Sequence, residues 1–349
     1  MNQKKEVTIY DIAKVLNLSA STVSRGLRNH PAIREETSRR IIDTARTMGY
    51  QQNTFARNLR KNRSNTLGVI LPRLDSSFQS AVVSGIEKKV NQIGYNLIIS
   101  QSRESVEKER ANVATMYNSR VEGLLISLAC DTRNLDHLNM FFEKGIPVVF
   151  FDRVKEHPRY KCTSVVIDNS QAAFDATEHL VEQGCRRIMF IGGNLLCHVY
   201  RERFRGYRKA LDEHGLSDDK GLTLIDILNE DTGVYAVKKI LEMDAPPDGI
   251  FAANDSSAVS VICELKQKGI RVPEDIAVVG FNNVHLSRVI DPGLTTIHYP
   301  GMEMGEVAAS TLIDMLDRES PVLTKTIVLS HQLIVRESSL KNKTSAVAR

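Results

Sequence analysis

The residues with the clearest chemical signal are the basic side chains near the start of this 349-residue chain. Residues 1–65 contain thirteen lysines and arginines against five acids, a formal charge of +8, whereas the whole chain carries +4. The remainder is therefore mildly acidic, at −4. A basic segment on an acidic body favours a polyanionic partner, because bound phosphates release their condensed counterions. Charge alone leaves open a solvated basic surface without a partner.

Other kinds of site chemistry are weakly represented in the sequence. It contains no G-x-G-x-x-G, P-loop or G-x-S-x-G motif, and its nine histidines show no H-E-x-x-H spacing. The five cysteines are scattered and never spaced as C-x-x-C, which predicts free thiols in a reducing compartment. We therefore expect no catalytic residue, no metal site and no cofactor.

The apolar segments are short, and the N-terminal residues do not resemble a leader. Apolar runs such as Val148–Phe151 fall far below the ~18 residues of a membrane span. The first residues lead into a polar, periodic segment without the apolar core of a signal peptide. With 42% hydrophobic and 25% charged residues, the composition is typical of a globular protein of two or three domains. We expect a cytoplasmic protein that does not enter membranes.

Two short helices are predicted at the start of the basic segment. Thr8 can cap the first, and Asp11 one turn later suits the positive end of the helix dipole. Asn17 tolerates the left-handed conformation that a tight helix exit requires. Ser19 is a good N-cap for the second helix, which carries Val23 inward. The spacing predicts two helices joined by a tight turn.

A third helix is predicted from Glu35 to Met48, ending before Gly49. Its apolar residues Ile41, Ile42 and Ala45 are expected to be buried. Three short helices, a tight turn between the first two and a basic surface predict a helix-turn-helix unit that binds DNA.

The sequence resembles the lactose repressor (LacI/GalR) family over almost its whole length. The matching segments are 7–13 (VTIYDIA), 19–25 (SASTVSR), 56–59 (ARNL) and 66–70 (TLGVI), and in the body 145–149, 166–169, 191–193, 203–207, 252–255, 272–275, 279–283 and 294–297. The resemblance implies an N-terminal all-α helix-turn-helix headpiece, a hinge, and an α/β two-lobed body of the periplasmic-binding-protein-like (type I) class.

The resemblance also implies which residues contact DNA. Ala20, Ser21 and Arg25 match base-reading positions of the major-groove helix, where Arg25 suits guanine, with a phosphate contact as its alternative. Leu59 matches a hinge-helix leucine that wedges into a central minor-groove step, with packing on the body as its alternative. The other expected DNA contacts are Thr8, Thr22, Ser24, Asn53 and Ala56.

Three residues of the headpiece depart from the family pattern, and the first is Gln52, which stands where the family usually has proline before Asn53. Gly26 replaces a common aliphatic residue in the second helix, at a cost of about 1 kcal/mol in helix propensity. Arg34 replaces the usual serine-type cap of the third helix, which exchanges a cap for a possible phosphate contact.

Downstream of residue 65, short apolar runs alternate with amphipathic segments. Strands are expected at 66–72, 95–100, 123–127, 147–151, 164–168, 187–192, 222–227, 249–253, 276–280 and 295–298, and helices near 78–93, 106–118, 134–144, 170–183, 201–214, 232–242, 255–268 and 302–318. This alternation predicts parallel sheets covered by helices. Ten strands exceed one comfortable sheet, so we expect two lobes with a crevice at the carboxyl ends of the strands.

The resemblance adds three chain crossings between the lobes, near 167, 297 and 329. The expected domains are a headpiece (1–53), a hinge helix or linker (54–65), an effector-binding and dimerisation domain (66–340) and a tail (341–349). Within the body, lobe 1 is expected at about 66–166 and 298–328, and lobe 2 at about 167–297 and 329–340.

Polar residues at strand ends match the family's ligand contacts, which here are Ser77, Phe78, Ser127, Asp152, Arg203, Asn254 and Asn282. Arg203 offers a fork of donors to hydroxyls, a carboxylate or a phosphate. Asp152 would accept hydroxyl bonds or form a surface ion pair with Arg153, and Phe78 would stack on a sugar or purine or belong to the core. Asn282 stands where the family often has Asp, which suggests a sugar acid or phosphorylated sugar, with neutral sugars as the safer class.

These features predict a sequence-specific transcriptional regulator, a repressor of a carbohydrate-catabolic operon. It would bind double-stranded DNA at a pseudo-palindromic operator as a homodimer, under allosteric control by a small sugar-type effector. The alternatives are a regulator of purine-like metabolism and a periplasmic-type sugar receptor. That receptor should carry a signal peptide and lack residues 1–62.

Overall fold

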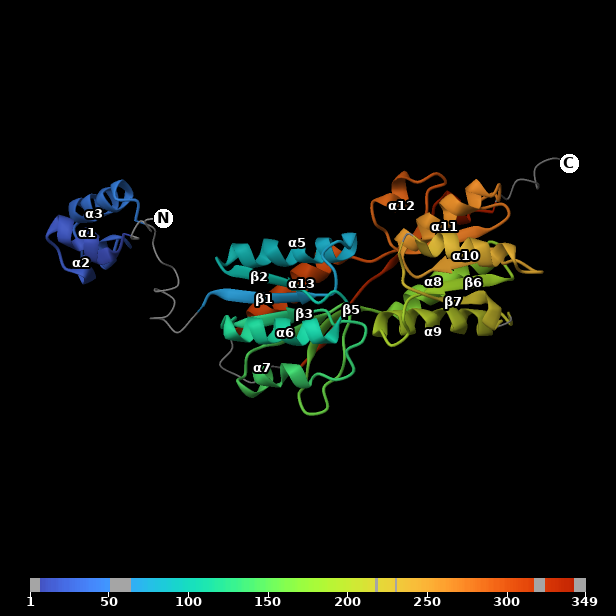
Figure 1. Cartoon of the computed structure of the whole chain (residues 1–349), viewed down its shortest axis with the longest axis horizontal. Helices are drawn as coiled ribbons and strands as arrows, with labels where there is room; N and C mark the ends of the chain where they lie inside the picture. The colour runs from blue at the N-terminus through green and yellow to red at the C-terminus, as the bar shows by residue number, and fades with distance from the viewer. Residues whose placement is uncertain (1–6, 51–63, 217–218, 230, 317–323, 342–349) are drawn as a thin grey trace, which may run out of the picture. The chain divides into compact units, whose positions relative to one another are not determined.

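The chain forms two compact units, residues 1–64 and 65–349. The computed structural model describes residues 7–50, 64–216, 219–229, 231–316 and 324–341 (Figure 1). The described residues of the first unit form the helices α1 (Ile9–Leu16), α2 (Ala20–Gly26) and α3 (Glu35–Thr47). The sequence predicted all three, and Asn17 has the expected left-handed conformation with φ of 54°.

The headpiece core is small and apolar. Ile12, Val23 and Ile41 are completely buried in it, one from each helix. Ile42 was predicted to be buried, but 39% of it is exposed. The face of α3 that packs inward is that of Ser38, Ile41 and Ala45, and one residue further along the helix is a rotation of about 100°. The prediction for Ile42 was therefore wrong.

Gly26 marks the closest approach of α2 to α3. A Cβ atom on Gly26 would lie 2.4 Å from Cδ1 of Ile41, and the Gly26 carbonyl accepts a hydrogen bond of 2.9 Å from the Ser38 hydroxyl. The low helix propensity of glycine is therefore offset by packing at this position, because a larger residue would push the two helices apart.

The second unit is built on two six-stranded sheets, and each sheet with its helices is called a lobe here (Figure 1). The sheet of the first lobe has the order β11-β5-β4-β3-β1-β2, and that of the second has the order β12-β10-β9-β8-β6-β7. Neighbouring strands run parallel, except that β10 and β12 are antiparallel. This is the parallel, helix-covered architecture that the alternating pattern predicted.

The first lobe contains the elements before residue 168 and two later ones. Its strands are β1 (Thr66–Leu71), β2 (Asn96–Gln101), β3 (Gly123–Ile126), β4 (Val148–Phe151), β5 (Thr163–Ile167) and β11 (Thr326–Leu329). Its helices are α5 (Ser77–Gln92), α6 (Val106–Asn118), α7 (Asn139–Glu143) with a 3-10 turn at Asp136–Leu138, and α13 (Gly301–Leu316).

The second lobe contains the remaining elements of the described body. Its strands are β6 (Ile188–Gly192), β7 (Thr223–Ile225), β8 (Gly249–Ala252), β9 (Ala277–Asn282), β10 (Thr295–His298) and β12 (Gln332–Ile334). Its helices are α8 (Asn169–Glu182), α9 (His198–Glu213), α10 (Asp231–Leu241), α11 (Asp255–Gln267) and α12 (Leu286–Val289), with 3-10 turns at Lys220–Leu222 and Glu337–Ser339.

Among the strands and α-helices of the described body, β11, β12 and α12 were not predicted from the sequence. β11 and β12 lie at the edges of their sheets and are only partly buried, and Val328 within β11 is 58% exposed. Such strands lack the continuous apolar run that marks a buried parallel strand. The chain passes between the sheets after β5, after β10 and between β11 and β12. The domain limits given above stay predictions.

Candidate functional site

The N-terminus of α1 is fixed by a reciprocal cap. The backbone N–H and the hydroxyl of Thr8 donate to Oδ2 of Asp11 at 2.8 and 2.7 Å. Ser19 caps α2 in a similar way, since its Oγ accepts a hydrogen bond of 3.1 Å from the Thr22 N–H. Arg34 at the start of α3 makes no side-chain cap. Local hydrogen bonds therefore set where α1 and α2 begin.

Helix α2 presents two of the predicted DNA contacts on its exposed surface. Ser21 and Arg25 are exposed and lie four residues apart, on one side of the helix. Ala20 is half-buried beside the headpiece core, and the Ser24 hydroxyl accepts a hydrogen bond of 3.0 Å from Arg28. The remaining predicted contacts Asn53, Ala56 and Leu59 lie outside the described residues.

A crevice of about 1010 Å³ lies between the two lobes of the second unit. It is lined by six of the seven residues predicted to bind ligand, namely Ser77, Phe78, Asp152, Arg203, Asn254 and Asn282. The seventh, Ser127, is completely buried, and its hydroxyl donates to Oδ2 of Asp152 at 3.4 Å. Ser127 thus stands behind the crevice wall.

Arg203 of α9 is a buried cation at the crevice wall. Only 3% of the residue is exposed, and its guanidinium lies 3.6 Å from the ring centre of Phe281. Its Nε donates to Oδ1 of Asn169 at 2.9 Å, and its Nη1 donates to the Ala253 carbonyl at 2.7 Å. Burial lowers the pKa of Arg203 from its ordinary value. No carboxylate among the described residues forms an ion pair with it, so its charge is available to a ligand.

The close packing of α9 against α8 places Arg203. A Cβ atom on Gly206 would lie 2.0 Å from the backbone oxygen of Ser170, so only glycine permits this approach of the two helices. Arg203 lies three residues before Gly206 and therefore shares its face of the helix, next to Asn169 at the start of α8.

Asp152 is held inside the body by two neutral hydrogen-bond donors and by the neighbouring Arg153 guanidinium. It directly follows β4 and has a φ of 58°, and it is 3% exposed. Its Oδ1 accepts a hydrogen bond of 2.8 Å from the Tyr299 hydroxyl, and its Oδ2 accepts one of 2.9 Å from Gln79. The closest ion pair of Arg153 is with Glu104, at 2.7 Å. The Arg153 Nε also lies 3.9 Å from Oδ2 of Asp152, so the ion pair between Asp152 and Arg153 that we considered from the sequence is present, but it is buried rather than at the surface.

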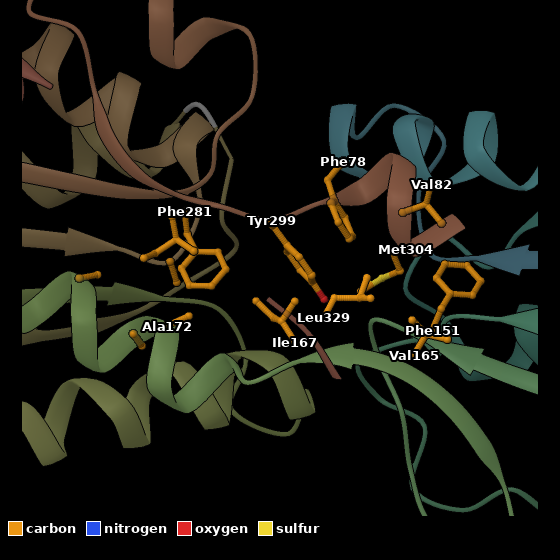
Figure 2. Packing of buried hydrophobic residues seen from close by; sticks show 14 of the residues in the cluster. Phe78, Val82, Phe151, Val165, Ile167, Ala172, Phe281, Tyr299, Met304 and Leu329 are labelled. Carbon is orange, nitrogen blue, oxygen red and sulfur yellow. The ribbon is translucent and has the colours of Figure 1, made fainter. Parts of the chain in front are cut away.

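Three aromatic rings stand in a row between the lobes, with Tyr299 between Phe78 and Phe281 (Figure 2). Tyr299 stacks on Phe78 at 4.2 Å between ring centres and meets Phe281 edge-on at 6.1 Å. Burial raises the pKa of Tyr299 well above its ordinary value, so its hydroxyl keeps the proton that it donates to Asp152. Tyr299 follows β10, where the chain crosses to the first lobe, and it joins both lobes to one network.

Asn254 and Asn282 line the crevice from the second lobe. The Asn254 side chain caps α11 by accepting a hydrogen bond of 2.8 Å from the Ser257 N–H. Asn282 ends β9 with a φ of 113°, and its buried Oδ1 has no hydrogen-bond partner among the described residues. A buried oxygen without a partner is costly unless a ligand or water supplies a donor.

Sequence reasoning missed two residues that shape this site, Tyr299 and Asp255. Asp255 is 1% exposed and accepts hydrogen bonds from the Thr296 hydroxyl at 2.6 Å and from the Val284 N–H at 2.8 Å. Burial raises the pKa of Asp255 to about 6. Tyr299 directly follows the predicted strand 295–298, and Asp255 comes two residues after the predicted strand 249–253. Both lie at the edge of a parallel sheet where ligands bind, and that position was the available signal.

The crevice wall carries more acidic than basic groups. Seven carboxylates line it together with three guanidinium groups: Asp75, Glu104, Asp131, Asp152, Asp226, Asp231 and Asp255 against Arg73, Arg153 and Arg203. Two of the arginines are already paired with a carboxylate, Arg73 with Asp75 and Arg153 with Glu104. The field inside the crevice is therefore negative except close to Arg203.

Comparison with known proteins agrees with this geometry. Residues 8–53 match the family described as bacterial regulatory proteins, lacI family, and residues 177–339 match the periplasmic binding protein-like domain. Catabolite control protein A of Priestia megaterium is 31% identical over 334 residues, which cover 95% of this chain and 99% of that protein. This chain belongs to the lacI family. It is a DNA-binding transcriptional regulator with an effector-binding body, as the sequence predicted.

Solved structures support the same assignment. The chain is 27% identical to the transcriptional regulator CelR in its cellobiose complex, covering 95% of this chain and 100% of that one, with a TM-score of 0.71. The Lac repressor dimer bound to operator and the anti-inducer ONPF has the same fold, with a TM-score of 0.85, 24% identity and coverage of 96% and 100%. The predicted fold class, a helix-turn-helix headpiece with a two-lobed body, is confirmed.

Two other kinds of feature are absent from the described residues. None of their helices has both the length and the apolar character needed to cross a membrane. They contain no group of three or more potential metal-ligating side chains.

Proposed function

We propose that this regulator is a cytoplasmic, non-catalytic repressor that binds a pseudo-palindromic operator as a homodimer and is controlled by a ligand in the crevice. The observation that carries this proposal is Arg203, a buried cation without a carboxylate partner at the wall of a crevice of about 1010 Å³. Burying a charge without a counter-charge is expensive, so a site retains one where a ligand makes use of it.

A neutral sugar fits the crevice better than a sugar acid or phosphorylated sugar. The excess of carboxylates over arginines repels an anion, whereas hydroxyl groups can donate to carboxylates and to the unpaired oxygen of Asn282. Arg203 then donates to a neutral hydroxyl or ring oxygen. The related CelR binds cellobiose, and this supports a carbohydrate ligand over a purine-like one.

Calorimetry on matched ligand pairs tests this assignment. The pairs are cellobiose with cellobionate, glucose with gluconate, and glucose with glucose 6-phosphate, within a wider panel of neutral sugars. We expect a neutral sugar to bind and its acid or phosphate form to bind at least tenfold more weakly. Binding of an acid or phosphate form alone would overturn the neutral assignment.

Control of DNA is tested by mobility shift on a pool of random-sequence duplexes with a salt titration. We expect binding at about 50 mM salt that weakens steeply as salt rises, because phosphate contacts release counterions. Leu59→Ala is expected to weaken binding to the selected duplexes far more than to unselected ones. Equal losses would contradict the wedge role of Leu59, and absence of DNA binding would contradict the proposed function itself.

A further inference from the structure

The loop after β3 and the start of α9 bring two cysteines from different lobes together. Cys130 follows β3 in the first lobe, and Cys197 immediately precedes α9 in the second. Both thiols are reduced, and both residues line a second cavity of about 380 Å³ that the two lobes share. Cys130 also lines the larger crevice. The pair therefore lies where the lobes meet, at the wall of this second cavity.

The two sulfur atoms interact directly and unequally. A hydrogen bond between the two thiols raises the pKa of Cys130 and lowers that of Cys197. The guanidinium of Arg153, which lines the same cavity, lowers the pKa of Cys197 further. Cys197 is also the N-cap of the 16-residue helix α9, where the positive end of the helix dipole stabilises a thiolate. The position of Cys197 at the N-terminus of α9 makes it the nucleophilic member of the pair.

We propose that Cys130 and Cys197 form a peroxide-sensitive dithiol whose oxidation joins the two lobes through a disulfide. The Cys197 thiolate attacks one oxygen of hydrogen peroxide, breaks the O–O bond and becomes a sulfenic acid as hydroxide leaves. The Cys130 sulfur then attacks the sulfenic sulfur, and its proton leaves with the displaced oxygen as water. The two thiols give up two electrons, and one peroxide is reduced to hydroxide and water.

The disulfide would close a chain segment that runs from the first lobe into the second. A bond across that segment restricts the unfolded chain and fixes the distance between the lobes near the crevice. In a reducing compartment such a bond is transient, which suits a sensor rather than a structural link. The reaction requires neither DNA nor effector, so it can be tested independently of the proposed function.

The test uses the full-length protein treated with a few equivalents of hydrogen peroxide and then digested without reductant. We expect mass spectrometry to find a peptide pair joined through Cys130 and Cys197. We also expect the thermal midpoint to rise by several degrees, and dithiothreitol to reverse both changes. Cys263→Ser is the matched control, because Cys263 on α11 is exposed and distant in sequence from the pair.

Single variants test the role of each thiol. In Cys130→Ser, dimedone is expected to trap a sulfenic acid at Cys197, whereas in Cys197→Ser it should leave Cys130 unlabelled. The proposal is overturned if peroxide links Cys263 between chains while Cys130 and Cys197 stay reduced. It is also overturned if dimedone labels Cys130 rather than Cys197. Circular dichroism of each serine variant verifies that the fold is retained.

Discussion

The headpiece and the effector crevice depend on contacts of very different range along the chain. The caps of α1 and α2 join residues three positions apart, Thr8 with Asp11 and Ser19 with Thr22. In the crevice, Asp152 bonds to Gln79 across 73 positions and to Tyr299 across 147. Local sequence therefore specifies the headpiece helices almost directly, whereas the crevice exists only after both lobes have folded. Changes in the two regions should have separable effects.

The largest expected effect separates effector binding from DNA binding. Arg203→Met removes the cation and its two hydrogen bonds to the second lobe. We expect the affinity for the neutral sugar to fall at least ~100-fold, about 3 kcal/mol, because the ligand loses charge-assisted bonds. Non-specific DNA binding should not change. Calorimetry and a mobility shift measure the two effects.

Arg205→Met is the matched control for this variant. Arg205 lies on the same helix, but its side chain is 68% exposed and pairs with Glu202 at 2.8 Å. The sugar affinity of Arg205→Met should stay within about twofold of the original. Equal losses in both variants would show that α9 has been disturbed as a whole and that Arg203 has no special role.

A second effect appears in the pH dependence of stability. Burial raises the pKa of Asp255 to about 6, above its ordinary 3.8. A carboxyl whose pKa is higher in the folded state binds its proton more tightly there, so its contribution favours folding below pH 4 and is lost as the pH rises through 6. Relative to Asp255→Asn, the unfolding free energy of the body should fall by on the order of 2 kcal/mol between pH 4 and 6.5. Denaturant titrations of both proteins measure this difference, and a flat difference would contradict the buried, titrating Asp255.

A smaller effect is expected in the headpiece, where helix propensity and packing have opposite consequences for one substitution. Gly26→Ala gains about 1 kcal/mol of propensity but places Cβ against Cδ1 of Ile41. We expect a net destabilisation of about 1 kcal/mol. Adding Ile41→Val, which lacks Cδ1, should recover part of the loss in a double-mutant cycle. If Gly26→Ala alone stabilises the headpiece, propensity outweighs packing and the close approach carries no cost.

The smallest expected effect concerns a single cap. Ser19→Ala removes the acceptor for the Thr22 N–H and should cost the headpiece about 1 kcal/mol or less. Ser21→Ala is its counterpart on the same helix, since Ser21 is exposed and predicted to contact DNA. We expect Ser21→Ala to weaken operator binding with little change in stability. Thermal melts and mobility shifts measure both effects. If Ser21→Ala lowered stability and Ser19→Ala weakened only operator binding, the roles assigned to the two serines would be wrong.

The same contrast in range explains how much could be predicted. Caps and periodicity were sufficient for the headpiece helices, and the alternating pattern located ten of the strands in the described residues. The exposure of Ile42 depends on how α3 rolls against its neighbours, which spacing alone does not determine. The edge strands β11 and β12 have weak patterns because few of their side chains are buried.

In the crevice, the residue types could be selected but their partners could not. Six of the seven predicted residues line the cavity, because strand ends converge at one edge of a parallel sheet. Asp152 accepts hydrogen bonds from Tyr299 and from Ser127, which lies behind it. Both contacts depend on how the two lobes pack around the chain crossing after β10. No local sequence pattern predicts such a long-range contact.

The central claim is that the crevice and the DNA-binding headpiece share one allosteric equilibrium, and a linkage measurement tests it most directly. The operator affinity is measured with and without the neutral sugar that passes calorimetry, and the sugar affinity is measured with and without the selected operator. Linkage requires both ratios to be the same, and we expect a factor between about 5 and 150. If the protein binds both the operator and the sugar but neither affinity changes when the other ligand is present, the account is contradicted.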